Sequence, residues 1–304
     1  MTTFKFGLVH APLTPFSNEH IDFETYGKLI DFHLRNGAEG LAVSTHTGES
    51  VSLTVDERKS LLEFTIKHVD GRIPVIAGVS ESGTGIATSL ALHARDAGAS
   101  ALIASAPYYW TPPQSMLVEH FSAIGAAGAL PLFVYNSPSE MGDVEFTTKS
   151  VLELFDRLPN FVGLIDASLD WQFMIELVSQ ARSAKPEFQF VSGNDYMISA
   201  GAIGATGLLS SLSNISPRIV RELYDLCHAE KYKDAAGRQT DLAAMCRLFR
   251  GTGLSGLKVA AGYMGRDCGI PRAPLPTLAN AQSQALIEKL STIHSVRAEP
   301  QGWR

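Results

Sequence analysis

The chain has 304 residues, of which 45% are hydrophobic and 18% are charged, and its formal net charge is -6 at pH 7. This length suits one large globular domain or a barrel with an appendage, because α/β barrels commonly take roughly 250 residues. Lysine and arginine are scattered along the chain, so the sequence offers no basic patch for nucleic acid or for an anionic membrane. A small-molecule partner is therefore expected.

Cysteine usage and hydropathy narrow the cellular setting. Cys227, Cys246 and Cys268 are odd in number and far apart, without CxxC spacing, which predicts neither a disulfide framework nor a metal site. The N-terminal segment lacks a basic stretch followed by a long apolar one, and no run reaches the roughly 18 apolar residues of a membrane span. We expect a soluble protein of the reducing cytoplasm with no membrane partner.

Eight short apolar runs alternate with segments of helical period. Each run is apolar on both faces, as buried parallel strands are, and each gap is long enough for a crossover helix. The runs are Phe6 to Val9, Gly40 to Val43, Ile73 to Val79, Ala101 to Ala104, Leu130 to Tyr135, Phe161 to Ile165, Phe188 to Val191 and Gly207 to Leu209. Eight β-α units predict a closed (β/α)8 barrel, also called a TIM barrel.

Helix signals separate the strands and continue beyond them. Thr54, with Glu57 three residues later, is typical of a capping box at a helix start. After residue 228 the β pattern ends, and three segments have helical character: Lys231 to Leu248, Leu254 to Met264 and Ala279 to Ile293. The sequence predicts a barrel over residues 1–228 and a C-terminal appendage of three helices over residues 229–304.

Polar residues follow most of the expected strands directly. In barrels of this kind the loops at the C-terminal ends of the strands carry the active site, so these residues should converge on one mouth. They are Ser44 to Ser50, Tyr108 and Tyr109, Tyr135 and Asn136, Asp166 and Ser168, Ser192 to Asp195, and Ser210 and Ser211. A single Ser or Tyr at a barrel mouth says little, but polar residues at six strand ends favour a functional site.

Two of these residues suggest specific chemistry. Gly48 would let backbone amides approach a ligand carboxylate closely, and the phenol of Tyr135 could relay a proton if its pKa were lowered. His46 alone could bind a metal, but no second ligand stands at a spacing that completes such a site, so hydrogen bonding is its expected role. No GxGxxG, Walker A, HExxH or GxSxG pattern is present. We therefore predict no metal and no cofactor.

Several short motifs resemble those of one family of barrel enzymes. THTGES at Thr45 to Ser50 resembles a GTTGES loop, and Pro107 to Tyr109 resembles PYY. Further matches are YNxP at Tyr135 to Pro138, SGDD at Ser192 to Asp195 and GxxS at Gly207 to Ser210. The family is that of dihydrodipicolinate synthase and N-acetylneuraminate lyase, and the resemblance covers nearly the whole chain. It implies a (β/α)8 barrel that forms a homotetramer or homodimer and acts on a 2-oxo acid such as pyruvate.

The resemblance also implies roles for single residues. In the family a lysine at the end of strand six, within GxKE or GxKD, forms an imine that serves as the electron sink. Here Ile165 stands at that position in Gly163 to Asp166, and no other lysine follows a strand end. Lys258 matches a helical tail position and is expected to be structural. The implied proton relay is Thr47, Tyr109 and Tyr135, with Tyr109 contributed by a neighbouring subunit.

Two further departures affect the implied substrate site. His46 replaces the first hydroxyl of the family's TTGE loop, and Glu140 replaces the arginine usual two positions after YNxP. A carboxylate in place of a guanidinium reverses the local charge, so binding of ordinary 2-oxo acids should weaken by roughly a few kcal/mol. The candidate substrate-binding residues are Gly48, Glu49, Ile165, Asp166, Ser192, Gly193, Asn194, Leu209 and Glu140.

Four hypotheses remain open. The first is a lyase or aldolase acting on a 2-oxo acid or related small carboxylate without an imine, with Tyr135 as acid or base, and His46 as a further acid, base or oxyanion donor. In it, Thr47 and Tyr109 relay protons, and Asp166 or Glu49 orients the catalytic groups.

The second hypothesis is a catalytically silent ligand-binding homologue in which Ile165 fills the space of the lysine. The third is an engineered replacement at Ile165, although His46 and Glu140 favour natural divergence. The fourth is hydrolysis or isomerisation by His46 and Glu49 on the same barrel, since barrels host many chemistries. The missing lysine argues against true dihydrodipicolinate synthase activity, and the sequence does not identify the substrate or pathway.

Overall fold

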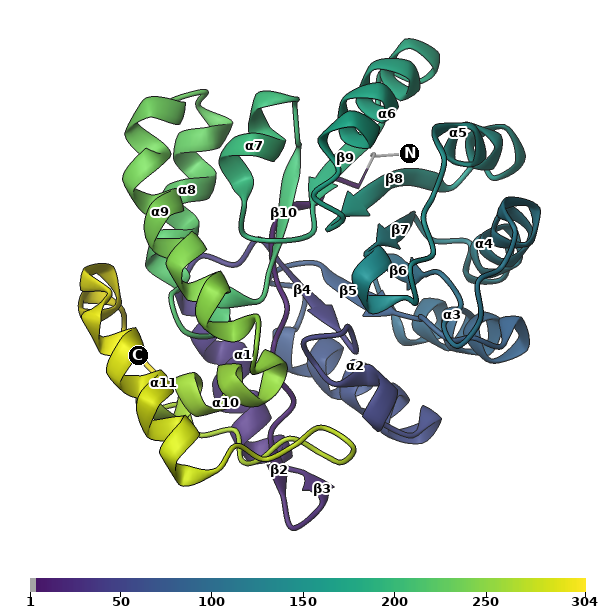
Figure 1. The fold of residues 1–304 in the computed structure, drawn as a ribbon. Coiled ribbons are helices and arrows are strands. Elements are labelled where there is room, and N and C mark those ends of the chain that lie inside the picture. The colour runs from purple at the N-terminus through teal and green to yellow at the C-terminus, as the bar shows by residue number, and fades with distance from the viewer. Residues whose placement is uncertain (1–3) are drawn as a thin grey trace.

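A closed barrel of eight parallel strands forms the centre of the computed structural model, which describes residues 4–304 (Figure 1). The barrel strands are β1 (Gly7–His10), β4 (Gly40–Val43), β5 (Val75–Gly78), β6 (Ala101–Ser105), β7 (Leu132–Asn136), β8 (Phe161–Asp166), β9 (Gln189–Ser192) and β10 (Gly207–Ser210). Neighbouring strands pair in chain order, and β1 closes the barrel against both β10 and β4. The predicted (β/α)8 fold is confirmed, with strand bounds shifted by a residue or two.

Helices follow the strands and surround the barrel (Figure 1). They are α1 (Phe23–Arg35), α2 (Val55–Val69), α3 (Thr84–Ala97), α4 (Gln114–Gly128), α5 (Thr148–Arg157), α6 (Trp171–Ala184), α7 (Met197–Ala202) and α8 (Pro217–His228). The predicted capping box is present, because Thr54 Oγ1 accepts from the Glu57 amide at 3.1 Å and Glu57 Oε2 accepts from the Thr54 amide at 2.8 Å.

Several short elements lie in the connections and were not predicted. A small hairpin joins β2 (Phe16–Ser17) to β3 (His20–Ile21), and the single 3-10 turns are η1 (Ser50–Ser52), η2 (Pro138–Glu140), η3 (Leu212–Asn214) and η4 (His294–Ala298). Such elements are too short for a periodic pattern to be visible in the sequence. Two of them, η1 and η2, border the functional site.

The core has two layers because successive residues of a strand point to opposite faces. Val9, Phe133, Ile165 and Val191 point into the barrel, where they pack with other apolar side chains. Residues of the opposite parity, such as Leu8, pack outward against the helices. The predicted strands are apolar on both faces for this reason.

Three helices follow the barrel, as predicted: α9 (Tyr232–Phe249), α10 (Gly253–Tyr263) and α11 (Asn280–Thr292). They lie on one flank of the barrel in Figure 1. Helix α9 is tied to the loop after β9, since Gln239 Nε2 donates to the Asp195 carbonyl at 2.7 Å. The expected boundary at residue 228 thus separates elements that share a contact surface. Over residues 4–304, no helix has the length and apolar character needed to cross a membrane.

Candidate active site

One cavity of about 530 Å³ opens at the C-terminal ends of the barrel strands. This volume is typical of small-molecule sites. Its walls come from the segments that follow β4 to β10, together with Cys246 of α9. The polar residues that follow the strands therefore meet at one mouth, although only some of them point into it.

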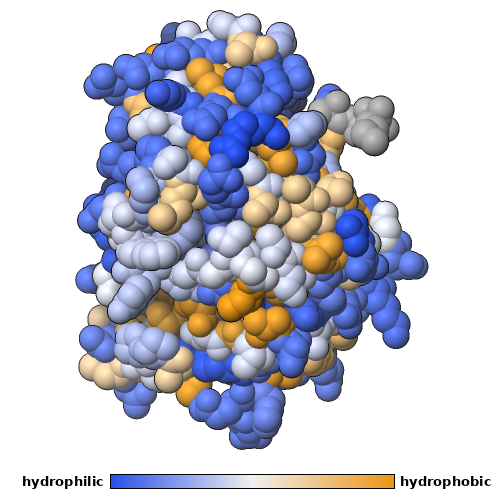
Figure 2. Space-filling model, turned by 90° about the vertical axis from the view of Figure 1, so that its right-hand side faces the viewer, coloured by the Kyte–Doolittle hydropathy of each residue, from blue (hydrophilic) through white to orange (hydrophobic). Residues whose placement is uncertain are grey.

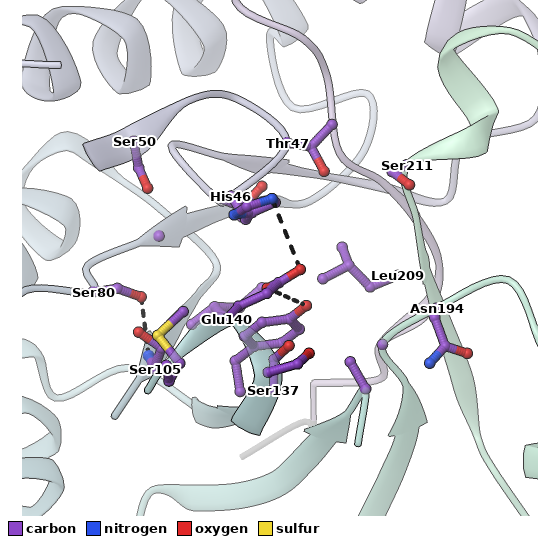
Figure 3. A pocket seen from close by; sticks show the side chains of 18 of the residues that line it. His46, Thr47, Ser50, Ser80, Ser105, Ser137, Glu140, Asn194, Leu209 and Ser211 are labelled. Carbon is purple, nitrogen blue, oxygen red and sulfur yellow. Dashed lines mark hydrogen bonds and ion pairs between the residues drawn. The ribbon is translucent and has the colours of Figure 1, made fainter. Parts of the chain in front are cut away.

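One wall of the cavity carries a phenol, a carboxylate and an imidazole in sequence. Strand β7 ends just after Tyr135, and the turn η2, with Pro138 at its start, brings Glu140 back over the phenol. Tyr135 Oη donates to Glu140 Oε2 at 3.4 Å, and Glu140 Oε1 lies 3.8 Å from His46 Nε2. Figure 3 shows His46 and Glu140 facing each other in the pocket. All three residues were candidate site residues, but no sequence motif indicates that they adjoin.

The pKa of Tyr135 is raised well above 10, chiefly because burial disfavours the phenolate and secondarily because Glu140 adds a negative charge beside it. A proton relay through Tyr135 was expected only if the pKa of its phenol were lowered. That condition is not met. At neutral pH the phenol keeps its proton, so Tyr135 is a hydrogen-bond donor and an acid rather than a base.

Asp166 lies behind the wall rather than in it. Its Oδ1 accepts from Asn136 Nδ2 at 2.6 Å, and its Oδ2 accepts from Ser168 Oγ at 2.9 Å. Burial raises the pKa of this carboxyl to about 6, although both hydrogen bonds oppose the shift. Asp166 does not line the cavity, so its position does not support the expected direct contact with substrate. Instead it joins the ends of β7 and β8.

Glu49 points away from the cavity, which corrects its predicted role. Its side chain is fully buried, Lys258 Nζ lies 2.7 Å from Oε1, and the Arg272 amide donates to Oε2 at 2.9 Å. Lys258 also donates to the Ile270 carbonyl at 3.1 Å. Lys258 is therefore in a structural ion pair, as expected, whereas the position of Glu49 supports the loop from outside the cavity and does not support direct contact with substrate. Its partners lie in the C-terminal region, which no local motif reveals.

Gly48 also serves a different purpose from the one expected. The amides of Gly48, Glu49 and Ser50 donate to carbonyls of Thr45 and His46 within the same loop, at 2.9 to 3.3 Å. They are thus unavailable to a ligand carboxylate. Gly48 instead allows close packing, because a Cβ there would lie 3.3 Å from the hydroxyl of Thr14. His46 and Thr47 of this loop do line the cavity.

Some of the remaining candidate substrate-binding residues line the cavity, and the others are buried behind it. Gly193, Asn194 and Leu209 line the cavity, whereas Ser192 is buried and donates to the Asn194 carbonyl at 2.8 Å. Ile165 is also buried, inside the barrel core, and does not line the cavity. Direct contact of Ser192 and Ile165 with a ligand is therefore not supported by their positions.

Tyr109 is outside the cavity of its own chain. Its side chain is 101% exposed and its φ is +89°, in the left-handed region that a residue with a side chain rarely adopts. The expected relay of Thr47, Tyr109 and Tyr135 is consequently not assembled within one chain. Tyr108 lines the cavity instead, and its phenol donates to Glu81 Oε1 at 2.9 Å.

Further residues line the cavity besides the candidate site residues. Tyr108 and Asp195, two of the polar residues expected at the mouth, line it. Asp195 is buried, accepts from Ser210 Oγ at 2.6 Å, and has a pKa raised to about 6 by burial. Ser80, Ser105, Ser137 and Cys246 also line the cavity and were not predicted. Ser137 stands within the YNxP motif, whereas Cys246 lies on a distant helix.

No lysine or arginine lines the cavity, all of whose walls belong to the described residues. Within residues 4–304, no group of three or more His, Cys, Asp or Glu side chains is arranged to hold a metal ion. The polar groups of the site are therefore hydroxyls, one imidazole, two carboxyls, one carboxamide and one thiol, and apolar side chains complete the lining.

A closed (β/α)8 barrel with one polar cavity at the C-terminal ends of its strands is the architecture of a barrel enzyme. The model of the dihydrodipicolinate synthetase family matches residues 5–293, and the chain belongs to that family. It has the lyase and aldolase fold of that family, as the sequence motifs implied.

Individual relatives are similar to this chain over nearly its full length. A 4-hydroxy-tetrahydrodipicolinate synthase of Thermoanaerobacter sp. is 32% identical over 96% of this chain and 97% of its own. The structure of a dihydrodipicolinate synthase from Aquifex aeolicus has a TM-score of 0.91 and 30% identity, covering 98% of this chain and 99% of that chain.

A third relative was solved with a ligand. It is a prophage protein of the dihydrodipicolinic acid synthase family from E. coli K12, in complex with pyruvate. Its TM-score is 0.89 at 25% identity, over 95% of this chain and 98% of that chain. The expectation of a lyase-class enzyme agrees with the names of these relatives.

Proposed function

We propose that the chain is a lyase- or aldolase-class enzyme that acts on a small carbonyl compound, in the first place a 2-oxo acid, without a lysine imine. By the motif resemblance, Ile165 stands where the family has its imine-forming lysine, and its side chain is fully buried. The absence of lysine from the lining of the cavity supports the proposal. An aliphatic side chain cannot attack a carbonyl, so a different electron sink is needed.

The observation that carries this proposal is the row Tyr135, Glu140 and His46. The protonated phenol of Tyr135 would donate a hydrogen bond to the carbonyl oxygen of the substrate, where negative charge develops as an enolate forms. The imidazole of His46 would accept the proton released from the neighbouring carbon. Glu140 lies between them, and its negative charge, 3.8 Å from His46 Nε2, would stabilise the imidazolium that forms. In this mechanism hydrogen bonding replaces the positive charge of an imine.

The proposal is tested by reductive trapping. The protein and an Ile165→Lys variant would be incubated with pyruvate and longer 2-oxo acids, reduced with borohydride, and weighed intact by mass spectrometry. We expect no adduct on the unmodified protein, because no lysine reaches the cavity, and an adduct on the variant. An adduct on the unmodified protein would contradict the imine-free mechanism, and peptide mapping would then locate the nucleophile.

A silent ligand-binding protein remains the second candidate, because loss of the lysine alone would also produce one. Proton exchange in deuterated water distinguishes the two candidates. An enzyme would catalyse exchange of the substrate protons next to the carbonyl, and a binding protein would not. Hydrolysis or isomerisation by His46 and Glu49 is not retained, since Glu49 pairs with Lys258 outside the cavity at 2.7 Å.

We further propose a cytoplasmic homotetramer or homodimer in which Tyr109 of one copy reaches the cavity of a neighbour. Its full exposure, beside Trp110 at 56%, supports this arrangement. Apolar patches also interrupt the hydrophilic face that carries α3 to α6 (Figure 2). We expect light scattering to give an oligomeric mass and Tyr109→Ala to lower turnover. A monomer that is fully active would contradict this assembly.

A further inference from the structure

The charge of the cavity wall is negative. Glu140 and Asp195 are its acidic residues, and His46 is its one residue able to carry a positive charge. The Asp195 carboxyl is 2% exposed and accepts from Ser210 Oγ at 2.6 Å, whereas the Glu140 side chain is 32% exposed. Glu140 is therefore the more accessible carboxylate for a ligand.

Two basic side chains near the cavity, Arg58 and Lys258, are committed to other partners. Arg58 is buried, its NH2 group donates to the Gly78 carbonyl at 3.0 Å, and its NH1 group lies 3.6 Å from Glu81 Oε2. Lys258 pairs with Glu49 in the same way, out of reach of the cavity. Within residues 4–304, Glu140 forms one ion pair, and its partner is His46.

Glu140 has spare capacity to accept hydrogen bonds. Its side chain is 32% exposed, its contact with the Tyr135 phenol is long at 3.4 Å, and His46 Nε2 is too distant to donate at 3.8 Å. A carboxylate offers about four acceptor sites, so most of them are open. When the phenol turns toward a substrate oxygen, one more becomes free. Figure 3 shows the carboxylate among the other lining side chains of the pocket.

We propose that the substrate carries a positively charged amino or guanidino group that binds Glu140. A guanidinium is favoured because its planar pair of N–H donors matches the two oxygens of a carboxylate. A second carboxylate on the substrate would meet the like charge of Glu140 instead, and no lysine or arginine lines the cavity to receive it. The inference rests on the proposed function only for the 2-oxo acid end of the substrate. The charged end is argued from Glu140 alone.

Three 2-oxo acids of similar length separate the effect of charge from that of the carbonyl. They are 5-guanidino-2-oxopentanoate, 2-oxohexanoate and 2-oxoglutarate, and their affinities would be measured by calorimetry at low ionic strength. We expect the guanidino compound to bind about tenfold more tightly than 2-oxoglutarate, with 2-oxohexanoate between them. Added salt should reduce the difference because the interacting carboxylate is partly exposed.

Variants assign the preference to one side chain. Glu140→Gln should abolish the preference for the guanidino compound, and Glu140→Arg should reverse it in favour of 2-oxoglutarate. Glu140→Asp retains the charge and should retain the order of affinities. Asp143→Asn is the matched control, because it removes an exposed acid from the same loop without changing the cavity.

A second pair of probes lacks the 2-oxo acid group: butylguanidinium and pentanoate. If butylguanidinium binds only when Glu140 is present while no 2-oxo acid binds, the inference stands and the proposed function fails. Tight binding of 2-oxoglutarate to the unmodified protein, or an unchanged order of affinities in Glu140→Gln, overturns the inference. The inference is also overturned if substitution of Glu140 changes the binding of neither series, or if no probe binds at all.

Discussion

The surroundings of Tyr135 determine what its phenol can do in a reaction. The motif YNxP identified the phenol, but the direction of its pKa shift depends on burial and on Glu140, which reaches it only through the turn η2. A phenol with a raised pKa stabilises a developing enolate by donating a proton or hydrogen bond, and it cannot act as the resting base. The base must therefore be another group, for which His46 is placed.

Removal of this donor gives the first prediction at the residue scale. Tyr135→Phe keeps the ring and its packing but loses the hydroxyl, so proton exchange next to the substrate carbonyl should slow by about 10²- to 10³-fold. Nuclear magnetic resonance in deuterated water would measure the exchange, and thermal unfolding would check that the fold is intact. Exchange at the original rate in a folded variant would exclude Tyr135 from catalysis.

At the scale of elements, a buried pair of histidines joins β1 to α1. His10 Nδ1 lies 3.1 Å from His33 Nδ1, and His33 Nε2 lies 3.2 Å from Asn214 Oδ1. That oxygen also accepts from the Leu13 amide, so it is an acceptor and His33 Nε2 is the donor. Burial lowers the pKa of both imidazoles, so both rings are neutral at neutral pH. In the neutral rings His33 Nδ1 accepts from His10 Nδ1, and His10 Nε2 carries no proton.

Neutral buried histidines make stability depend on pH. Burial lowers the pKa of His33 to about 3, so between pH 6.5 and 3 the unfolded chain binds a proton that the folded chain does not. Stability is lost as pH falls through this window, by about 2 kcal/mol at pH 5 for one such group. Urea titrations at pH 7 and pH 5 should show a larger loss for the unmodified protein than for His33→Gln. An equal loss would contradict the buried neutral state.

Comparison with one variant is needed because other buried groups act in the opposite sense. The pKa values of Asp166 and Asp195 are raised to about 6, so these carboxyls favour the folded state as pH falls from 6 toward 4. Asp166 and Asp195 are present in both the unmodified protein and His33→Gln. Their effect therefore cancels when the losses of stability of the two proteins are compared.

Strands and long helices could be predicted because their patterns are local. A run that is apolar on both faces, such as Gly40–Val43, shows its environment in its own residues. Glu49 could not be placed in this way, since its partner Lys258 belongs to α10 and nothing in the THTGES motif indicates it. Tyr109 shows a second limit, because its expected role depends on a neighbouring copy of the chain.

At the scale of the whole molecule, the ion pair between Glu49 and Lys258 connects the loop of the cavity to the C-terminal helices. Both side chains are at most 1% exposed, and the pair distance is 2.7 Å. Removal of one member leaves a buried charge without a partner, which costs about 3–5 kcal/mol. The loop carrying His46 and Thr47 would be disturbed with it.

A double-mutant cycle tests this connection. Glu49→Gln and Lys258→Met should each destabilise the protein by about 3–5 kcal/mol, and the double variant should lose clearly less than their sum. Urea unfolding would measure the three differences. Additive losses would mean that the two side chains do not interact in solution.

Glu140 belongs to a three-residue turn, Pro138–Glu140, that takes no part in barrel pairing. Its exposed side chain can be exchanged without a change in strand register, whereas the buried groups beneath it cannot. Mutation during evolution could therefore change which ligands the barrel accepts at little risk to folding. The same property makes this turn the natural place to begin redesigning the enzyme for new substrates.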